Sequence, residues 1–318
     1  MKEHLLCLTV DTDPDGLSGK VIDRQTLRWN GLEYLQTLSD DFAGVSELAP
    51  VPLTWFVRAD GQLESILGTP AYLLEKYANF WAEVRTLRHE IAWHPHLYRQ
   101  VRRGDEVALI TNPNEAQDEL ERLWSRLKPC LFATTFRNGE GWHTPETYAA
   151  VERLGFPCDS TGIPGRSGVN GHPMNWSGAP NLPYFPQLED LCMSGPPRDM
   201  LEIPMNTWYS QAPHDRSPRL RYMNPAVHCS LFTKALESWE NACKASTSEL
   251  SVWVMIFHPD EVLETQSADG LYARSIRDLR KNLQAMADCL RRLGYMFEWT
   301  TVSYAAKRWR AHHLRTIA

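Results

Sequence analysis

The sequence predicts a barrel-like α/β fold of about seven strands. Short apolar runs alternate with amphipathic helical patterns along most of the chain, which is typical of a parallel sheet covered by helices. The chain has 318 residues, of which 43% are hydrophobic, and this is enough for a large core. No fixed-period repeat and no low-complexity linker divides it. We therefore expect a single domain over residues 1–318, and we favour a barrel over a doubly wound open sheet.

Each strand is predicted from a short apolar run, and each helix from apolar residues at helical spacing. The predicted strands lie at residues 5–8, 51–57, 89–93, 131–133, 200–205, 251–257 and 295–300. The predicted helices lie at residues 24–38, 72–84, 112–127, 144–155, 225–243, 276–290 and 307–315. Pro113 and Pro145 suit first helical turns, because the capping residues Asn112 and Thr144 precede them. Strand and helix therefore alternate without a break up to residue 155.

The pattern breaks at about residues 160–199, where glycine, proline, asparagine and aromatic residues are dense. An irregular segment of this length inside a compact domain is usually functional or disordered, and its aromatic content favours an ordered wall or lid. Aromatic residues in and just after this loop insertion could stack on a sugar or another flat group, although core packing is the commoner fate of any one aromatic side chain. The candidates for substrate binding are Trp176, Tyr184, Trp208 and Tyr209.

Composition and charge exclude several classes of partner. The formal net charge is -6, and no basic run with interleaved aromatic residues argues for nucleic acid. No segment reaches the roughly 20 apolar residues of a membrane span, and the N-terminus lacks the pattern of a signal peptide. The seven cysteines show no CxxC pairing and are typical of reduced thiols in a cytoplasmic protein. We expect a small soluble substrate and no nucleic-acid or membrane partner, and the sequence leaves open whether the chain forms a homo-oligomer.

Polar groups stand where four of the predicted strands stop. They are Asp11 with Asp13, His94 with His96, Arg137, and His258. A barrel brings these strand ends to one mouth, where carboxylates and imidazoles together suit a divalent metal. The two aspartates would face one pocket and repel each other unless a cation or a basic side chain lay between them. The sequence therefore predicts a metal site at this end of the barrel.

Motifs for other reaction classes fail. The run HEIAW at 89–93 begins like the helix of a zinc protease but has Trp93 where the second histidine belongs. No GxSxG, Walker A or GxGxxG run occurs. The sequence thus gives no support for a serine hydrolase or a phosphate-binding loop.

Five short runs resemble the successive motifs of a known family. The runs are TVDTD at 9–13, RHEIAWH at 88–94, FRNG at 136–139, LEIP at 201–204 and FHP at 257–259. In this order they resemble the motifs of the polysaccharide deacetylases with a NodB-homology domain, and the resemblance spans residues 5 to about 302. It implies a distorted (β/α) barrel, a divalent metal that is usually zinc, and hydrolysis of an amide on an amino sugar.

The resemblance also implies a role for each matching residue. Asp11 would be the general base and Asp13 a metal ligand, and His94 would be the next ligand. Arg137 would hold Asp11 in place. His258 would be the acid that protonates the departing amine.

This sequence departs from the family pattern at two positions. The family has a second histidine four residues after the first ligand histidine, where this chain has Tyr98, and it commonly has a proline where this chain has Gly139. An additional histidine, His96, lies two residues after His94. Because Pro95 forces an extended or turn geometry, both imidazoles can point to the same side. We therefore expect His96 to be the third metal ligand, and the alternative is Tyr98 or a water that it holds.

Together these features predict a cytoplasmic, metal-dependent amide hydrolase, with Zn²⁺ as the expected metal. It would remove an acetyl, formyl or similar small acyl group from an amino sugar or a related small polar molecule. One alternative is a cyclic-amide hydrolase of the same fold. The other is a non-catalytic ligand-binding barrel that has lost its metal.

Overall fold

The computed structural model of the chain describes residues 2–16, 25, 27–37, 51–100, 107–168, 171–264 and 270–316. Within these residues, eight parallel strands form the main sheet, in the order β11-β1-β2-β3-β6-β7-β8, and β12 also pairs with β1. Their bounds are β1 (Glu3–Asp11), β2 (Leu53–Arg58), β3 (Glu90–His94), β6 (Thr135–Phe136), β7 (Cys158–Asp159), β8 (Leu201–Glu202), β11 (Leu250–Phe257) and β12 (Met296–Trp299). A parallel bridge between Met205 and Val254 joins the segment after β8 to β11. This closure confirms the predicted distorted α/β barrel.

The first strand, β1, is the centre of the sheet. It pairs with β11 along almost its whole length, with β12 in its first half and with β2 in its second half. Every residue of β1 after Glu3 is buried. A strand covered on both faces needs the continuous apolar run that Leu5–Leu8 supplies. The strand therefore carries Asp11 to one end of a rigid scaffold.

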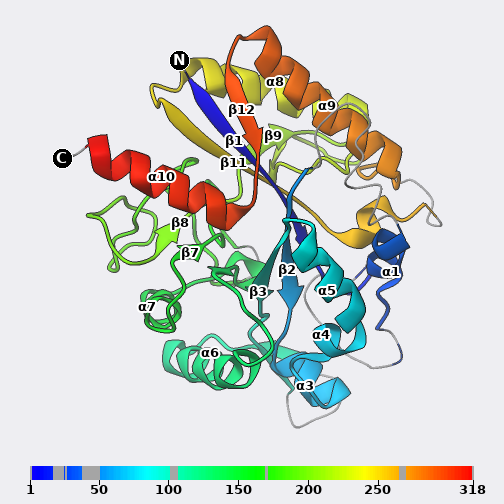
Figure 1. Cartoon of the computed structure of the whole chain (residues 1–318), viewed down its shortest axis with the longest axis vertical. Helices are drawn as coiled ribbons and strands as arrows, with labels where there is room; N and C mark the ends of the chain where they lie inside the picture. Colours follow the sequence, from blue (N-terminus) through cyan, green and yellow to red (C-terminus); the bar gives the residue numbers. More distant parts are fainter. Residues whose placement is uncertain are drawn as a thin grey trace.

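The helices lie around the outside of the sheet (Figure 1). They are α1 (Asn30–Thr37), α3 (Gly61–Leu67), α4 (Tyr72–Lys76), α5 (Ala78–Thr86), α6 (Pro113–Leu127), α7 (Pro145–Arg153), α8 (Cys229–Ala245), α9 (Ile276–Arg292) and α10 (Val302–Thr316), with two short 3₁₀ helices at Gly139–Gly141 and Pro259–Val262. The predicted caps form: the side chain of Asn112 accepts backbone N–H groups at the start of α6, and that of Thr144 does so at α7. No described helix is long and apolar enough to cross a membrane.

Several predicted boundaries move in the structure. The helix expected at 72–84 is interrupted at Tyr77 and forms two helices, α4 and α5. The strand expected from residue 131 starts only at Thr135, because Phe132 points to solvent and is 78% exposed. The helix expected at 24–38 is described only as α1, and residues 24 and 38 lie outside the described part of the chain.

Several short elements were not predicted from the sequence patterns. They are helix α3 and two antiparallel hairpins, β4 (Tyr98–Gln100) with β5 (Val107–Leu109) and β9 (Thr207–Ser210) with β10 (Arg219–Tyr222). The described parts of 160–199 contain no helix or strand, and isolated bridges such as Ser167 to Asn175 and Pro186 to Ser194 hold them. The irregular segment that the sequence predicts at about 160–199 is therefore ordered in its described parts without regular structure.

Candidate metal centre and active-site cavity

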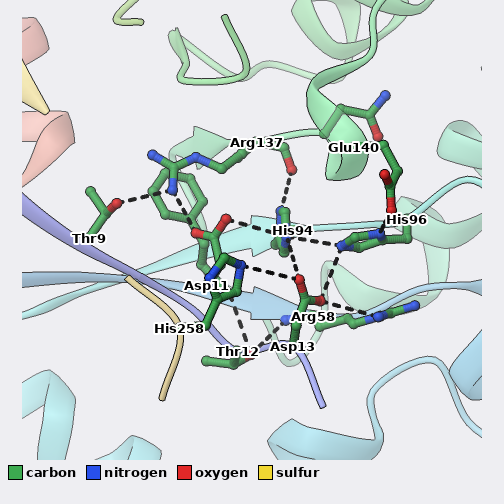
Figure 2. Close-up of polar contacts among 12 residues, drawn as sticks. Thr9, Asp11, Thr12, Asp13, Arg58, His94, His96, Arg137, Glu140 and His258 are labelled. Atoms are coloured by element: carbon green, nitrogen blue, oxygen red, sulfur yellow. Dashed lines mark hydrogen bonds and ion pairs between the residues drawn. The ribbon is translucent and has the colours of Figure 1, made fainter. Parts of the chain in front are cut away.

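The predicted polar residues meet at the carboxyl ends of the parallel strands (Figure 2). Asp11 is the last residue of β1 and His94 the last residue of β3. Arg137 directly follows β6, and His258 directly follows β11. These strands follow one another in the sheet as β11-β1-β2-β3-β6, with only β2 between β1 and β3, so residues far apart in the sequence come together at one edge.

Asp13, His94 and His96 form a compact set of metal-binding groups, with one potential ligand atom from each lying within 4.8 Å of the others. Nε2 of His96 lies 3.1 Å from Oδ1 of Asp13 and 3.1 Å from Nε2 of His94. Two ligands held at 2.0–2.1 Å around a tetrahedral ion are about 3.3 Å apart. The spacing of the two imidazole nitrogens therefore fits a single ion.

The partners of the two rings determine which nitrogens face the centre. Nδ1 of His94 donates a hydrogen bond to the carbonyl oxygen of Arg137 at 2.9 Å, so Nε2 has a free lone pair. Nδ1 of His96 lies 3.6 Å from the carboxylate of Glu140, which favours a proton on that nitrogen as well. Two lone pairs and a carboxylate at this separation repel one another unless a cation lies among them. Without a metal that cation is a proton on His96: burial would lower the pKa of this ring, but the carboxylate of Asp13 raises it to about 9. The donor set therefore fits a divalent metal.

A tight turn brings His96 beside His94. The backbone N–H of Tyr98 donates to the carbonyl of His96 at 3.0 Å, and the N–H of Gly139 donates to the carbonyl of Pro95 at 2.7 Å. The ring of Tyr98 stacks on the far side of His96, with centroids 6.4 Å apart, and its hydroxyl bonds to Glu140. Burial raises the pKa of the Tyr98 phenol, which disfavours the anionic form that a metal ligand needs.

The two departures from the family pattern fit each other in space. A Cβ atom at Gly139 would lie 2.4 Å from Cγ of His96, which is far inside contact distance. A proline at residue 139 would therefore occupy the space of the His96 ring. A histidine at position 96 thus requires a glycine at position 139, so the two departures depend on each other.

Arg58 is a site residue that our sequence reasoning missed. It is the last residue of β2 and is fully buried, and its guanidinium donates to Asp13 at 3.1 Å, to Asp60 at 2.8 Å and to Gln62 at 2.8 Å. Burial would raise the pKa of Asp13, but the two histidines and Arg58 outweigh it and hold that pKa well below its usual range. The available signal was an arginine at the end of an apolar run, the same pattern that singles out Arg137.

Arg137 fixes one oxygen of Asp11 and leaves the other free. Its Nη1 donates to Oδ1 of Asp11 at 2.6 Å and to Thr9 at 3.0 Å, while Nε and Nη2 are held by Ser160 at 2.9 and 3.0 Å. Oδ2 of Asp11 lies 3.6 Å from Nε2 of His94, beside the metal-binding set. A carboxylate oriented in this way can accept a proton from a group bound at that set.

His258 also lies beside this set, next to Asp11 (Figure 2). Its Nε2 is 3.7 Å from Asp13, and its Nδ1 is 3.2 Å from Glu261. Burial alone would lower the pKa of His258, but the nearby carboxylates of Glu261, Asp13 and Asp11 raise it to about 10. The imidazole is therefore protonated at neutral pH and can donate a proton.

These residues line a cavity of about 850 Å³, within the range of small-molecule sites. None of the four predicted substrate aromatics is among its described lining residues. Trp176 is 2% exposed and donates its indole N–H to Gly141 at 2.6 Å, and the buried Tyr184 donates its hydroxyl to Leu191 at 2.6 Å. Trp208 lines a smaller neighbouring cavity, and Tyr209 is 68% exposed. The aromatic rings in the cavity wall are instead those of Tyr98, Tyr222 and Tyr272.

Solved structures share this fold. A candidate polysaccharide deacetylase from Mycobacterium smegmatis is 17% identical with a TM-score of 0.53, and the match covers 98% of this chain and 92% of that one. An allantoinase is 12% identical with a TM-score of 0.55, over 98% and 91% of the two chains. A further candidate polysaccharide deacetylase, from Pseudomonas aeruginosa PAO1, is 13% identical with a TM-score of 0.54, over 98% and 92%. No protein-family model and no curated protein sequence matches the chain. At these identities the likeness establishes the fold, which is the distorted α/β barrel that the sequence predicts.

Proposed function

We propose that this protein is a metal-dependent hydrolase of carbon–nitrogen bonds other than peptide bonds, which removes an acetyl, formyl or similar small acyl group from an amino sugar or a related small polar compound. The observation that carries the proposal is the convergence of the imidazoles of His94 and His96 on Asp13, beside a candidate base and a candidate acid. The distant likeness to deacetylase folds supports the same reaction class.

The metal would be held by Asp13, His94 and His96. When bound, a divalent ion such as Zn²⁺ polarises the acyl oxygen and lowers the pKa of water to about 7. Oδ2 of Asp11 would accept the proton of the attacking water, while Arg137 keeps the carboxylate in orientation. His258 would donate its proton to the departing nitrogen, because an amine leaves poorly as an anion.

A second candidate reaction is the opening of a cyclic amide. The allantoinase with the same fold favours it, since the same base, acid and metal could act on a ring amide. The two reactions differ in their products: deacylation releases a free acid and an amine, whereas ring opening leaves both groups on one molecule. We place the protein in the cytoplasm, and this location favours a small soluble substrate over an extracellular polymer.

The decisive experiment is a release assay with the purified protein, first treated with a chelator and then reloaded with Zn²⁺. Acetate and formate are measured from a panel of soluble N-acyl sugars and nucleotide sugars, with cyclic amides tested in parallel. We expect acetate or formate to be released, the chelator to abolish this release, and Zn²⁺ to restore it. A metal-bound protein that hydrolyses no member of either panel would contradict the proposal and favour a ligand-binding barrel.

A further inference from the structure

The cavity wall contains a cation that the proposed chemistry does not use. Arg166 lines the active-site cavity and also the smaller cavity of about 180 Å³ beside it. Tyr222 lines the same two cavities, and its ring lies 6.5 Å from that of His258, centroid to centroid. Arg166 therefore lies on the side of the cavity where we place the acid.

The other charges of the cavity wall are already matched within the protein. Each lining carboxylate has a partner: Asp11 with Arg137, Asp13 with Arg58, Glu140 with His96, Asp260 with Arg274, and Glu261 with His258. The guanidinium of Arg166 makes no hydrogen bond or ion pair within the described chain. Partial burial removes some of the water around the charged side chain of Arg166. No ion pair within the described chain compensates for that loss of hydration. A bound metal would make the cavity still more positive.

The backbone around Arg166 is firmly held. Its carbonyl oxygen accepts the N–H of Trp176 at 2.7 Å, and its N–H donates to Ile163 at 3.0 Å. His172, which belongs to the same bridged segment, also lines the cavity. Its Nδ1 accepts the N–H of Met174 at 3.2 Å, so a neutral ring has its proton on Nε2, a buried atom with no partner among the described residues. Arg166 and His172 therefore line the same cavity, and each has a hydrogen-bond donor without a partner among the described residues.

We propose that Arg166, together with His172 of the same cavity wall, binds an anionic oxygen group of the substrate, either a carboxylate or a phosphate. This inference rests on the proposed hydrolase function and narrows it to N-acyl compounds that carry a negative charge away from the amide. A guanidinium fork matches both kinds of anion in geometry and charge.

The test compares matched substrates on the metal-loaded full chain at constant ionic strength. N-acetylglucosamine is the neutral member, its 6-phosphate supplies a phosphate, and N-acetylmuramic acid supplies a carboxylate. We expect kcat/KM to be higher for at least one charged member, and Arg166→Gln should reduce the charged-to-neutral ratio by about 10- to 100-fold, since a hydrogen bond to a charged group is worth about 1.5–3 kcal/mol. The loss should lie in KM, because this contact is the same in the ground and transition states.

Arg219→Gln is the matched control. Arg219 has a largely exposed side chain that pairs with Asp215 at 3.3 Å and does not belong to the described wall of the active-site cavity. The control should keep the wild-type ratio. A ratio near one in the wild type, or an equal ratio in the wild type and Arg166→Gln, would overturn the inference.

A binding measurement separates failure of this inference from failure of the hydrolase proposal. Calorimetric titration with glucosamine 6-phosphate and with glucosamine requires no turnover. If the wild type binds glucosamine 6-phosphate more tightly than glucosamine, and Arg166→Gln loses this difference, the anion site is supported even if no N-acyl compound is hydrolysed. Equal binding of the two compounds, or equal phosphate binding by the two proteins, excludes the anion site even if hydrolysis is found.

Discussion

The strand ends and the segment at 160–199 place their side chains under different constraints. At the ends of β1 and β3, hydrogen-bonded pairing fixes each residue, so Asp11 and His94 point where the strand geometry dictates. The described parts of the segment that joins β7 to β8 contain no regular ladder, and packing decides which of its rings turn inward. Trp176 and Tyr184 are buried away from the cavity, whereas the arginine at 166 in the same segment lines it. Position along a strand therefore predicts a site residue better than residue type within a loop.

The largest effect should come from removing the base at the end of β1. Asp11→Asn keeps the shape of the side chain but cannot accept the proton, so kcat should fall by at least about 100-fold. Metal content should stay unchanged, because Asp11 is not one of the three proposed ligands. Residual activity above about a tenth of the wild-type rate would show that another group is the base.

His258→Ala tests the acid at the end of β11. We expect a loss that is larger for substrates with poor leaving groups than for an activated ester, with metal still bound. In the wild type, the raised pKa of His258 places loss of the acid form on the alkaline side, so its activity should persist well above pH 7. An equal loss for both kinds of substrate would argue against His258 as the acid.

A smaller effect, on metal affinity, is expected from disturbing the contact between His96 and Gly139. Gly139→Ala adds a Cβ atom that would lie 2.4 Å from the His96 ring, so the ring must move and metal affinity should fall by about 10-fold or more. Gly178→Ala is the control, because the added atom there would meet its nearest neighbour at 3.8 Å. Titration of the apo proteins with Zn²⁺ gives both values. Equal affinities would mean that the ring of His96 can shift without consequence.

The smallest effect should come from the loop aromatics. Tyr184→Phe removes a buried hydroxyl that donates to Leu191, so the free energy of unfolding should fall by about 1 kcal/mol. Its KM should equal that of the wild type, because Tyr184 is not among the described residues of the cavity wall. Tyr209→Phe, at an exposed ring, should change neither quantity. Urea unfolding measures the free energy of unfolding, and steady-state kinetics measures KM. A raised KM in Tyr184→Phe would show that this ring does contact the substrate.

The sequence could predict the barrel and the cluster at its mouth because both follow from local patterns. Apolar runs mark the strands, and the residues after them reach one edge, which is how Asp13, His94 and His96 are brought together. Partners that are distant in the sequence could not be predicted in the same way. The contact of Arg58 with Asp13 depends on the register between β1 and β2, and the space for His96 depends on Gly139, which lies directly against its ring.

The central claim is that Asp13, His94 and His96 hold a catalytic metal in place of the family's usual ligand set. Elemental analysis of purified wild type, His96→Ala and Tyr98→Phe, each checked for folding by circular dichroism, tests it most directly. The account predicts about one bound Zn²⁺ per chain in the wild type and in Tyr98→Phe, and a sharp loss in His96→Ala. Retention of metal by folded His96→Ala together with its loss from Tyr98→Phe would contradict the account and assign the third ligand to Tyr98.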